Sequence, residues 1–355
     1  MNKNNYAVIM AGGIGSRFWP MSTAKTPKQF IDILGTGETL IQQTFNRLRK
    51  ICPIDNIFIV TNKNYKSLCI EQISEIKPNN ILCEPVMRNT APCLAYAAFK
   101  IFSLNEKAKM IVAPSDHLIT NEEEFVKIVN ESLTAIEKTN SLLTLGIKPN
   151  RPDTGYGYIQ FNDENLSSNN KIKKVKTFTE KPNQELALQF IDSGDFSWNS
   201  GIFIWKVKDI LLSIRKYLRD IYDIFETGHN YFNTEKEEDF IEQNFPLCKN
   251  ISIDYGIMEK ADNVYVYNCN FGWSDLGTWG SLYNHLQKDQ NENVLVGNNV
   301  KLYNCSGNIV NLSDKKNVIL EGLENFIIVE KDNTLLICKK DSEQKIKDFV
   351  SNLNK

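Results

Sequence analysis

The residues that first suggest chemistry lie in the stretch AGGIGSRFWPMSTAKTPKQF (11–30), directly after the apolar run YAVIM. The stretch combines three glycines with one arginine and two lysines. Glycine lets a backbone approach a ligand closely, and a glycine-rich turn at the carboxyl end of a strand commonly binds phosphate through free N–H groups. The pattern therefore predicts an anion-binding turn at Gly12, Gly13 and Gly15, with cationic side chains beyond it.

Two well-known phosphate motifs fail on this stretch. The dinucleotide fingerprint G-x-G-x-x-G could begin at Gly13, but its third glycine falls on Phe18. The P-loop needs G-K-[S/T] after four intervening residues, and no such sequence follows. What remains is G-G-x-G-x-R, ending at Arg17, followed by Lys25 and Lys28. These cations suit a polyphosphate better than a dinucleotide, although an ordinary surface turn can have the same composition.

Length, composition and charge limit the class of protein. With 355 residues, 42% hydrophobic and 24% charged, and a formal net charge of −2, the chain has the profile of a soluble protein with one large or two smaller domains. Near-neutral charge disfavours a nucleic-acid partner, which usually leaves a basic surface. The densest basic run, KIKKVK (171–176), alternates like one solvated face of a strand.

Cysteine usage and hydropathy favour the cytoplasm. The eight cysteines include no C-x-x-C pair, so we expect no structural zinc site. The first apolar run is too short for a signal peptide, and no stretch approaches the ~18 apolar residues of a membrane helix. We therefore expect reduced thiols, a cytoplasmic protein and no membrane partner.

Strand-like and helix-like segments alternate over the first 150 residues. Apolar runs at 6–10, 57–62, 81–85, 110–116 and 142–147 alternate with helical patterns such as 39–51 and 91–102. This rhythm predicts an α/β fold with a Rossmann-like, mostly parallel sheet and crossover helices. Ligands of such sheets bind beyond the carboxyl ends of the strands. The candidates are therefore the polar residues after each run: the glycine-rich loop, Glu84 to Thr90, and Ser115 to His117.

The texture of the sequence changes after residue 150. Aromatic-rich strand patterns precede a helical stretch at 206–225, and from residue 291 short Val/Ile/Leu runs are separated by Asn and Gly. The tail predicts small stacked strands of a β-helix or β-roll, whose period the sequence does not fix. QKDQNEN (287–293) has the composition of a linker. We therefore expect one domain at 1–286 and a small β-rich C-terminal domain at 287–355.

Seven motifs occur in the order seen in sugar-nucleotide pyrophosphorylases: the glycine-rich loop, EPVMRNTAP (84–92), APSDH (113–117), TGYGYI (154–159), FTEKP (178–182), WNSGIF (198–203) and GWSDLGTW (272–279). Within that group the sequence resembles the mannose-1-phosphate guanylyltransferases over about its first 285 residues. The tail resembles the short β-helical end of single-function members. The resemblance implies a nucleotidyltransferase domain at 1–286 that transfers GMP from GTP to α-D-mannose 1-phosphate, giving pyrophosphate and GDP-mannose for polysaccharide biosynthesis.

The implied reaction sets requirements on the phosphate-binding residues. A sugar-phosphate oxygen attacks the α-phosphorus of GTP in line, so the protein must align and screen anions rather than supply a nucleophile. By resemblance, Ala11 and the three glycines contact the triphosphate, while Arg17 and Lys28 stabilise charge on the transferring and leaving phosphates. Lys28 matches the signature lysine of the family, and the role of Lys25 stays open.

The resemblance also implies a magnesium site. Mg²⁺ takes hard oxygen ligands, often only one or two carboxylates together with phosphates and water. By resemblance, Asp116 and Asp275 hold one Mg²⁺, although each alone has the context of a turn or helix-cap aspartate. We expect His117 to be a buried or supporting histidine rather than a catalytic base.

The sugar-phosphate site is assigned by resemblance to Gly155, Tyr156, Gly157, Glu180, Lys181 and Asn199. Lys181 would bind the sugar phosphate, and Glu180 and Asn199 would accept hydrogen bonds from sugar hydroxyls. The two glycines would bring backbone amides close to the sugar. Alternatively, Glu180 and Lys181 form an exposed ion pair of little energetic weight, and Tyr156 belongs to the core.

Base selection is assigned to the EPVMRNTAP loop. Guanine presents N1–H and N2–H₂ donors and an O6 acceptor, so its site needs a carbonyl or carboxylate together with a donor. Glu84, Arg88, Asn89 and Thr90, with nearby backbone, can supply both. The sequence does not show which atoms pair.

Other functions remain as alternatives. The motifs do not exclude a pyrophosphorylase of the same fold that acts on another sugar or base. A non-catalytic, sugar-nucleotide-binding regulatory subunit would be expected to lack an intact set of Arg17, Lys28, Asp116 and Asp275, and all four are present. A nicotinamide oxidoreductase is disfavoured by Phe18.

The resemblance also bears on assembly. It suggests a homodimer, with the β-rich tail as the expected contact surface. Many relatives carry a second, cupin-type isomerase domain, for which 355 residues leave no room. We therefore expect the transferase activity alone.

Overall fold

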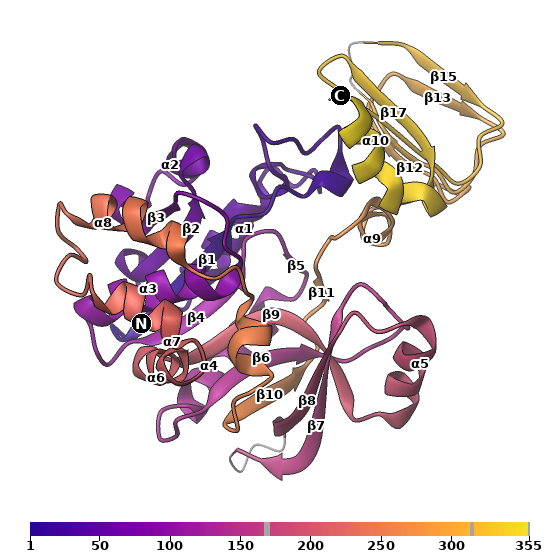
Figure 1. Cartoon of the computed structure of the whole chain (residues 1–355). Helices are drawn as coiled ribbons and strands as arrows, with labels where there is room; N and C mark the ends of the chain where they lie inside the picture. Colours follow the sequence, from indigo (N-terminus) through magenta and orange to yellow (C-terminus); the bar gives the residue numbers. More distant parts are fainter. Residues whose placement is uncertain (167–170, 313–315, 354–355) are drawn as a thin grey trace. The chain divides into compact units, whose positions relative to one another are not determined.

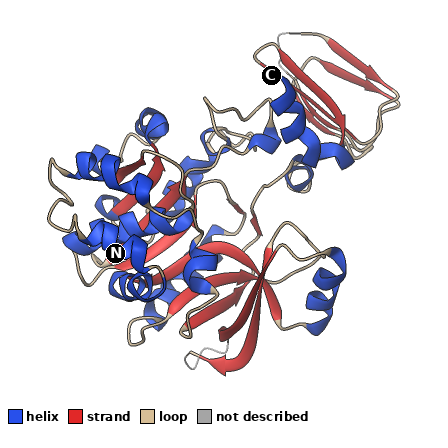
Figure 2. Cartoon of the chain, in the orientation of Figure 1, coloured by secondary structure: helices blue, strands red, loops and turns tan. Residues whose placement is uncertain are grey.

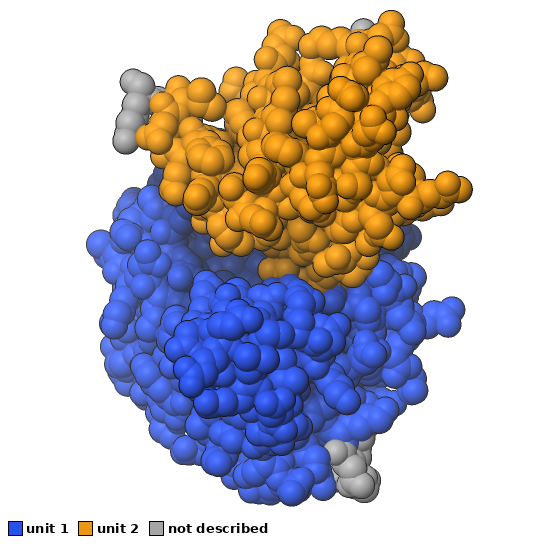
Figure 3. Space-filling model, turned by 90° about the vertical axis from the view of Figure 1, so that its right-hand side faces the viewer, with its two compact units in different colours: residues 1–12, 44–115, 119–273 blue, residues 13–43, 116–118, 274–355 orange. Residues whose placement is uncertain are grey.

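The computed structural model describes residues 1–166, 171–312 and 316–353 (Figure 1). The chain forms two compact units (Figure 3). Unit 1 comprises Met1–Gly12, Thr44–Ser115 and Ile119–Trp273, and unit 2 comprises Gly13–Gln43, Asp116–Leu118 and Ser274–Lys355. The expected boundary after residue 286 stays a prediction, because a compact unit groups segments by contact rather than by chain order.

Unit 1 is built on a sheet that has nine strands within the described residues, in the order β3-β2-β1-β4-β9-β6-β10-β8-β7. The strands are β1 (Asn5–Ala11), β2 (Ile57–Asn62), β3 (Ile81–Glu84), β4 (Lys109–Pro114), β6 (Leu142–Ile147), β7 (Gly157–Asn165), β8 (Ile172–Glu180), β9 (Phe196–Lys206) and β10 (Val264–Cys269). Strands β1 to β4 pair in parallel, as do β6 and β10. Strand β9 is antiparallel to β4 and β6, and β8 is antiparallel to β7 and β10. The predicted α/β fold is confirmed, with a mixed sheet in which β8 and β9 run against the others.

Helices cover this sheet, as Figure 2 shows. They are α2 (Lys66–Gln72), α3 (Thr90–Leu104), α4 (Glu122–Ala135), α5 (Gln184–Ser193), α6 (Val207–Tyr217), α7 (Arg219–Glu226) and α8 (Glu237–Asn244). Helix α3 is buried from Ala91 to Ile101, because its small and apolar side chains pack in one core with α6 and α7. The helical stretch expected at 206–225 is two helices, since Leu218 leaves the helical conformation between them.

Unit 2 joins the segment after the glycine-rich turn to the C-terminal tail. Its core contains Phe18, Leu40, Trp279, Ile327 and Ile346, and the rings of Phe18 and Trp279 lie 5.1 Å apart. These side chains come from the N-terminal segment, from the helices α9 (Trp279–Tyr283) and α10 (Ile346–Leu353), and from the tail strands. The short strands β5 (Leu118–Ile119) and β11 (Trp273–Ser274) and the helix α1 (Leu40–Leu48) each contain a border between the units.

The tail has the predicted stack of small strands, which pair in parallel except for the antiparallel pair β16 and β17. One sheet contains β12 (Val294–Val296), β14 (Ile309–Asn311), β16 (Phe326–Lys331) and β17 (Thr334–Lys339), and β13 (Val300–Tyr303) pairs with β15 (Val318–Glu321). Val294 pairs with Ile309, and Ile309 pairs with Ile327. The spacing therefore changes from 15 to 18 residues between successive turns, which explains why the sequence shows no fixed period.

Buried asparagines hold successive turns of this stack together. Asn308 donates from Nδ2 to Asn293 Oδ1 at 2.9 Å and to the Leu323 carbonyl at 2.8 Å, while its own oxygen accepts from the Phe326 N–H. Both asparagines are almost fully buried. Buried polar side chains are tolerated when they are fully hydrogen-bonded, as these are.

Two further features concern the whole described chain. The eight cysteines, all within its described part, are free thiols. No helix in the described ranges is long and apolar enough to cross a membrane.

Candidate active site

The glycine-rich turn folds back onto Lys28. Gly15 has a left-handed backbone (φ 71°), and a Cβ at this position would lie 2.5 Å from the Cβ of Lys28, so only glycine fits. The Lys28 N–H donates to the Ile14 carbonyl at 3.1 Å. A Cβ at Gly13 would meet no heavy atom within 4 Å among the described residues, so the turn is open at that position.

The Lys28 ammonium lies at the centre of a buried cluster in unit 2. The residue is only 3% exposed, and its Nζ donates to the carbonyls of Asp275 at 2.9 Å and Leu276 at 3.0 Å. The same Nζ forms an ion pair with Asp116 Oδ2 at 2.8 Å. An ammonium has three donors, and all three are thus directed at protein oxygens. The structure brings together three residues that the sequence predicted from distant motifs.

Neighbouring groups act on both aspartates of this cluster. Burial by itself raises the pKa of Asp116, but the Lys28 ammonium and His117 outweigh it, so that the pKa lies below its ordinary value. Asp275 Oδ1 accepts from the Gly277 N–H at 2.9 Å. Leu276, between Asp275 and Gly277, has φ 45°. This conformation is costly for a residue other than glycine, and such strained residues cluster at functional sites.

Arg17 and His117 lie in the same unit. Arg17 belongs to a 3₁₀ turn at Ser16–Phe18, and its Nε is buried without a hydrogen-bond partner among the described residues. His117 Nε2 lies 3.9 Å from Asp116 Oδ1, which agrees with a supporting position. Lys25 is exposed.

In unit 1, Glu84 is a buried carboxylate at the end of β3. It is 5% exposed, and its Oε1 has no hydrogen-bond partner within the described chain. Burial raises its pKa to about 7. Its Oε2 would lie 3.7 Å from a Cβ at Gly12, which follows Ala11 at the end of β1. Glu84 therefore lies near Gly12, at the beginning of the glycine-rich turn, and its Oε1 can accept a hydrogen bond from a ligand.

The other residues of the base loop hold the loop itself. Arg88 donates to the Pro246 carbonyl at 2.7 Å. Asn89, with φ 67°, caps α3 by accepting from the Thr90 N–H at 2.9 Å. Thr90 Oγ1 accepts from the Ile253 N–H at 2.8 Å. Of the four residues predicted for base selection, Glu84 has an unpaired buried acceptor, Oε1, and Arg88 has an unpaired buried donor, Nε, among the described residues.

The predicted sugar residues lie at the ends of β7, β8 and β9. A Cβ at Gly157 would lie 2.5 Å from Glu180 Oε1 and 3.5 Å from the Cβ of Asn199, so glycine lets these three positions meet. Burial raises the pKa of Glu180, and neighbouring Lys181 partly offsets this. Lys181 is exposed, has φ 49°, and donates its N–H to the Tyr156 carbonyl.

Tyr156 belongs to an aromatic cluster. Its ring lies 5.0 Å from that of Trp198 and 5.2 Å from that of Trp273. Arg151, which the sequence analysis did not single out, stacks on Trp198 at 5.0 Å and donates to Asp153 at 2.7 Å. Asp153 in turn accepts from the Gly155 N–H at 2.9 Å. Packing among these rings is thus sufficient to explain why an aromatic residue occupies position 156.

Sequence reasoning missed Asp254, which contacts a predicted sugar residue. Asn199 Nδ2 donates to Asp254 Oδ1 at 2.8 Å. The Asn199 oxygen already accepts from the Gly201 N–H at 3.1 Å and from Thr144 Oγ1 at 3.4 Å, so the amide offers a ligand a donor rather than the predicted acceptor. The available signal was an isolated acidic residue in the apolar run ISIDYGIM (251–258).

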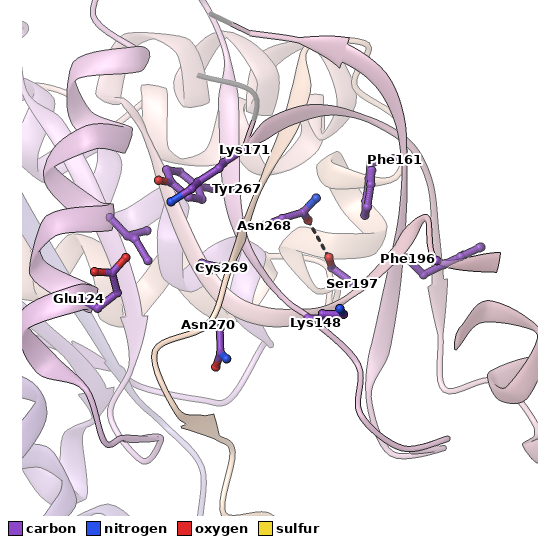
Figure 4. A pocket seen from close by; sticks show the side chains of 12 residues that line it. Glu124, Lys148, Phe161, Lys171, Phe196, Ser197, Tyr267, Asn268, Cys269 and Asn270 are labelled. Carbon is purple, nitrogen blue, oxygen red and sulfur yellow. Dashed lines mark hydrogen bonds between the residues drawn. The ribbon is translucent and has the colours of Figure 1, made fainter. Parts of the chain in front are cut away.

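A separate cavity of about 420 Å³ lies in unit 1 (Figure 4). Its wall includes Phe161, Tyr267 and the pair Ser197–Asn268, joined by a 2.7 Å hydrogen bond. The cavity does not include any of the predicted site residues, and its two lysines, Lys148 and Lys171, are exposed. We assign it no role in the reaction.

Comparisons with known proteins identify the family. The nucleotidyl transferase model matches residues 6–292, and the mannoseP isomerase/GMP-like beta-helix domain model matches residues 297–353. The chain is 36% identical over 353 residues to the alginate biosynthesis protein AlgA of Pseudomonas putida, covering 98% of this chain and 71% of that protein. It is 35% identical over 348 residues to the mannose-1-phosphate guanylyltransferase of Klebsiella pneumoniae, covering 97% and 72%.

A solved structure agrees over almost the whole chain. The crystal structure of a protein titled mannose-1-phosphate geranyltransferase, from Thermus thermophilus, superposes with a TM-score of 0.88 at 28% identity, covering 99% of this chain and 100% of that one. The fold, the motif order and these matches lead to one conclusion. The chain belongs to the nucleotidyl transferase family, among the relatives of the mannose-1-phosphate guanylyltransferases.

Proposed function

We propose that this chain transfers GMP from GTP to α-D-mannose 1-phosphate and releases GDP-mannose and pyrophosphate. Relatives of that name, about a third identical, support the proposal. The observation that carries it is the Lys28 ammonium, which joins Asp116 to the backbone of Asp275 and Leu276. Group transfer that needs aligned charge but no protein nucleophile requires such a fixed arrangement.

Arg17 is the cation that we assign to the transferring phosphates. Its buried Nε has no partner among the described residues, whereas the donors of Lys28 are all directed at protein oxygens. A guanidinium held at the glycine-rich turn can donate two parallel bonds to a phosphate. Lys28 then acts as a positioning residue for the two aspartates, a narrower role than direct contact with phosphate. On the acceptor side, Lys181 remains the proposed ligand of the sugar phosphate.

Asp116 and Asp275 have the chemistry of a magnesium site. The lowered pKa keeps Asp116 ionised at neutral pH, and Mg²⁺ often takes only one or two carboxylates beside phosphate and water. No group of three or more potential metal ligands occurs among the described residues, so the protein would supply only this pair. When bound, Mg²⁺ neutralises phosphate charge and orients the phosphate oxygens. We propose it as the cofactor.

Glu84 is the residue that we assign to the guanine base. An ionised carboxylate accepts two hydrogen bonds side by side, which matches the N1–H and N2–H₂ donors of guanine. Adenine lacks this pair of adjacent donors. The orphan Oε1 supports this assignment, because it belongs to a carboxylate whose other oxygen, Oε2, lies close to Gly12.

Assembly and location are proposed from the edge of the tail sheet and from the cysteines. Strand β17 is an edge strand of its sheet, and it exposes Leu335 (55%) and Ile337 (51%). Such an edge is a pairing surface for a second strand, so we propose a homodimer through the tail. Sedimentation of wild type and of Ile337→Lys tests this, with a monomeric variant as the expected result. The free thiols support a cytoplasmic location.

Pyrophosphate release tests the proposed function. GTP and Mg²⁺ are incubated with mannose 1-phosphate, glucose 1-phosphate or no sugar phosphate, and wild type is compared with Lys28→Ala and Asp275→Ala. We expect release only with mannose 1-phosphate, and its loss in both variants. Asp262→Asn is a matched control, because its side chain is 94% exposed.

The outcomes separate the alternatives. Release with glucose 1-phosphate alone would keep the mechanism and replace the substrate. Tight GTP binding without release under any condition would reject the enzyme and leave a sugar-nucleotide-binding regulatory subunit.

A further inference from the structure

Asp254 lies at a point where the backbone departs from regular structure. It begins a π-helical turn, Asp254–Met258. Such turns are rare in proteins overall, and those that occur are often found at functional sites. The turn is anchored by Ile257 and Met258, which are buried in the main core of unit 1. Asp254 is thus carried by a rigid element whose position is set by apolar packing.

The surroundings of Asp254 contain acceptors without matching cations. Glu180 at the end of β8 and Glu259 on the same turn as Asp254 both act electrostatically on its carboxyl group, and the described groups that shift its pKa include no lysine or arginine. Burial, with a smaller contribution from Glu180, raises the pKa of Asp254 to about 6 in spite of the hydrogen bond from Asn199. Burial, followed by the charges of Glu180, Glu259 and Asp254, raises the pKa of Tyr255, and these carboxylates make the surroundings negative.

The Asp254 carboxylate and the Asn199 amide can each form a further hydrogen bond. Asp254 Oδ1 accepts from Asn199 Nδ2, and the other hydrogen bond that acts on the carboxylate within the described residues comes from the backbone of Asp254 itself, not from a second side chain. Within the same part of the chain, the other N–H of the Asn199 amide is unused, while its oxygen is held by Gly201 and Thr144. A carboxylate acceptor and an amide donor side by side match a sugar hydroxyl, which both donates and accepts.

We infer that Asp254 is a sugar-binding residue: its carboxylate accepts a hydrogen bond from one hydroxyl of the hexose, next to the hydroxyls bound by Glu180. The inference rests on the proposed function, because it identifies a specificity residue of that site. Asp254 also orients the Asn199 amide, which then donates to a sugar oxygen. The contact therefore discriminates among hexose 1-phosphates by the position of a hydroxyl.

The test uses Asp254→Asn and a set of substrate analogues. The substituted amide keeps an oxygen that can accept from Asn199, so the internal hydrogen bond survives while the charge and the free acceptor are lost. At pH 7.5 we expect KM for mannose 1-phosphate to rise about 10- to 100-fold, the effect of removing one charged hydrogen bond. KM for GTP and the unfolding temperature should stay at the wild-type values. Asp262→Asn makes the same chemical change at an exposed site and should change neither constant.

Substrates that lack one hydroxyl, at C2, C3, C4 or C6 of mannose 1-phosphate, show whether the contact is direct. We expect one of the four to be used equally well by wild type and Asp254→Asn, because the hydroxyl that Asp254 binds is already missing. A second readout is pH. The wild-type KM for mannose 1-phosphate should rise below about pH 6, where Asp254 becomes protonated, and this rise should be smaller in the variant.

Three results would overturn the inference. Asp254→Asn could leave KM unchanged, could lose the same factor with all four deoxy substrates, or could raise KM for GTP equally; the last two would mean a structural role. Failure of the proposed function is distinguishable, because wild type would then release no pyrophosphate with GTP and mannose 1-phosphate at all.

Discussion

The Lys28 cluster of unit 2 and two acidic residues of unit 1, Glu84 and Asp254, differ in how their charges are balanced. In unit 2 the Lys28 ammonium is matched by Asp116 and two backbone carbonyls, so the cluster is fully hydrogen-bonded before any ligand binds. In unit 1 Glu84 and Asp254 are paired with no cation among the described residues, and burial raises their pKa values to about 7 and about 6. A satisfied cluster is rigid and preorganised for chemistry, whereas an unsatisfied acceptor gains stability when a ligand supplies the donor.

Backbone strain occurs in both regions. Leu276 in unit 2 and Lys181 and Asn89 in unit 1 have positive φ angles. Each such residue costs of order 1–3 kcal/mol and persists only where its surroundings hold it in place. These three residues lie in segments that the motifs identified, although positive φ angles also occur outside the motifs, as at Asn233 and Asn304.

The largest effect is expected for Lys28→Met. Removing the buried ammonium breaks its ion pair with the partly exposed Asp116 and removes the donor to two backbone carbonyls, which costs about 1–3 kcal/mol of stability, and pyrophosphate release should be lost. Thermal unfolding and the release assay measure the two effects, with the exposed Lys25→Met as control. The double variant Lys28→Met/Asp116→Asn should regain stability without activity. Unchanged stability of the single variant would contradict the satisfied-cluster description.

Arg17→Gln should affect activity alone. Because Nε of Arg17 has no partner among the described residues, the substitution removes no hydrogen bond of Nε from the folded protein. Losing one donor to a transition-state phosphate typically lowers kcat about 10²- to 10³-fold. Steady-state kinetics and unfolding of the same sample distinguish Arg17 from Lys28. A loss of stability as large as that of Lys28→Met would remove the distinction.

Glu84→Gln should make the protein more stable at alkaline pH. The carboxyl pKa is about 7 in the folded chain and ordinarily 4.5, so the folded state binds more protons between these values and stability falls as pH rises through them. The difference corresponds to about 3 kcal/mol above pH 7 and disappears below pH 4.5. Unfolding at pH 8 and at pH 4.5 measures it.

The same variant tests guanine recognition. Glu84→Gln should raise KM for GTP and reduce the preference for GTP over ITP, which lacks the 2-amino group. Unchanged preference would remove Glu84 from the base site even if the stability effect is found.

The smallest effect is expected in the tail. Asn308→Ala removes a buried side chain that bridges successive turns and leaves the Phe326 N–H without its acceptor, at a cost of about 1–3 kcal/mol. At a temperature where the variant is folded, kcat should be unchanged, because the Lys28 cluster makes its own contacts. A fall in kcat without unfolding would show that the tail influences the cluster of unit 2.

Much of the fold and part of the site could be predicted from the sequence. The strands and helices of the first 150 residues follow from local apolar periodicity, and the glycine-rich turn follows from its composition. The reversed β8 and β9 could not be predicted, because strand direction in a sheet depends on pairing between distant segments. The break at Leu218 and the role of Asp254 were missed, because neither has a local motif.

The sequence by itself determined the residue types at the site: the glycines of the turn, Arg17, Lys28 and the paired aspartates. Tertiary structure decided what each can do. Lys28 meets the Asp275 carbonyl 247 positions away along the chain, and that contact is the basis for proposing Lys28 as a positioning residue rather than a phosphate ligand. The groups packed around Glu84 and Asp254 leave the first with an unpaired oxygen and the second without a cation among the described residues. Charge balance and desolvation are properties of neighbours in space, so only the folded chain could decide them.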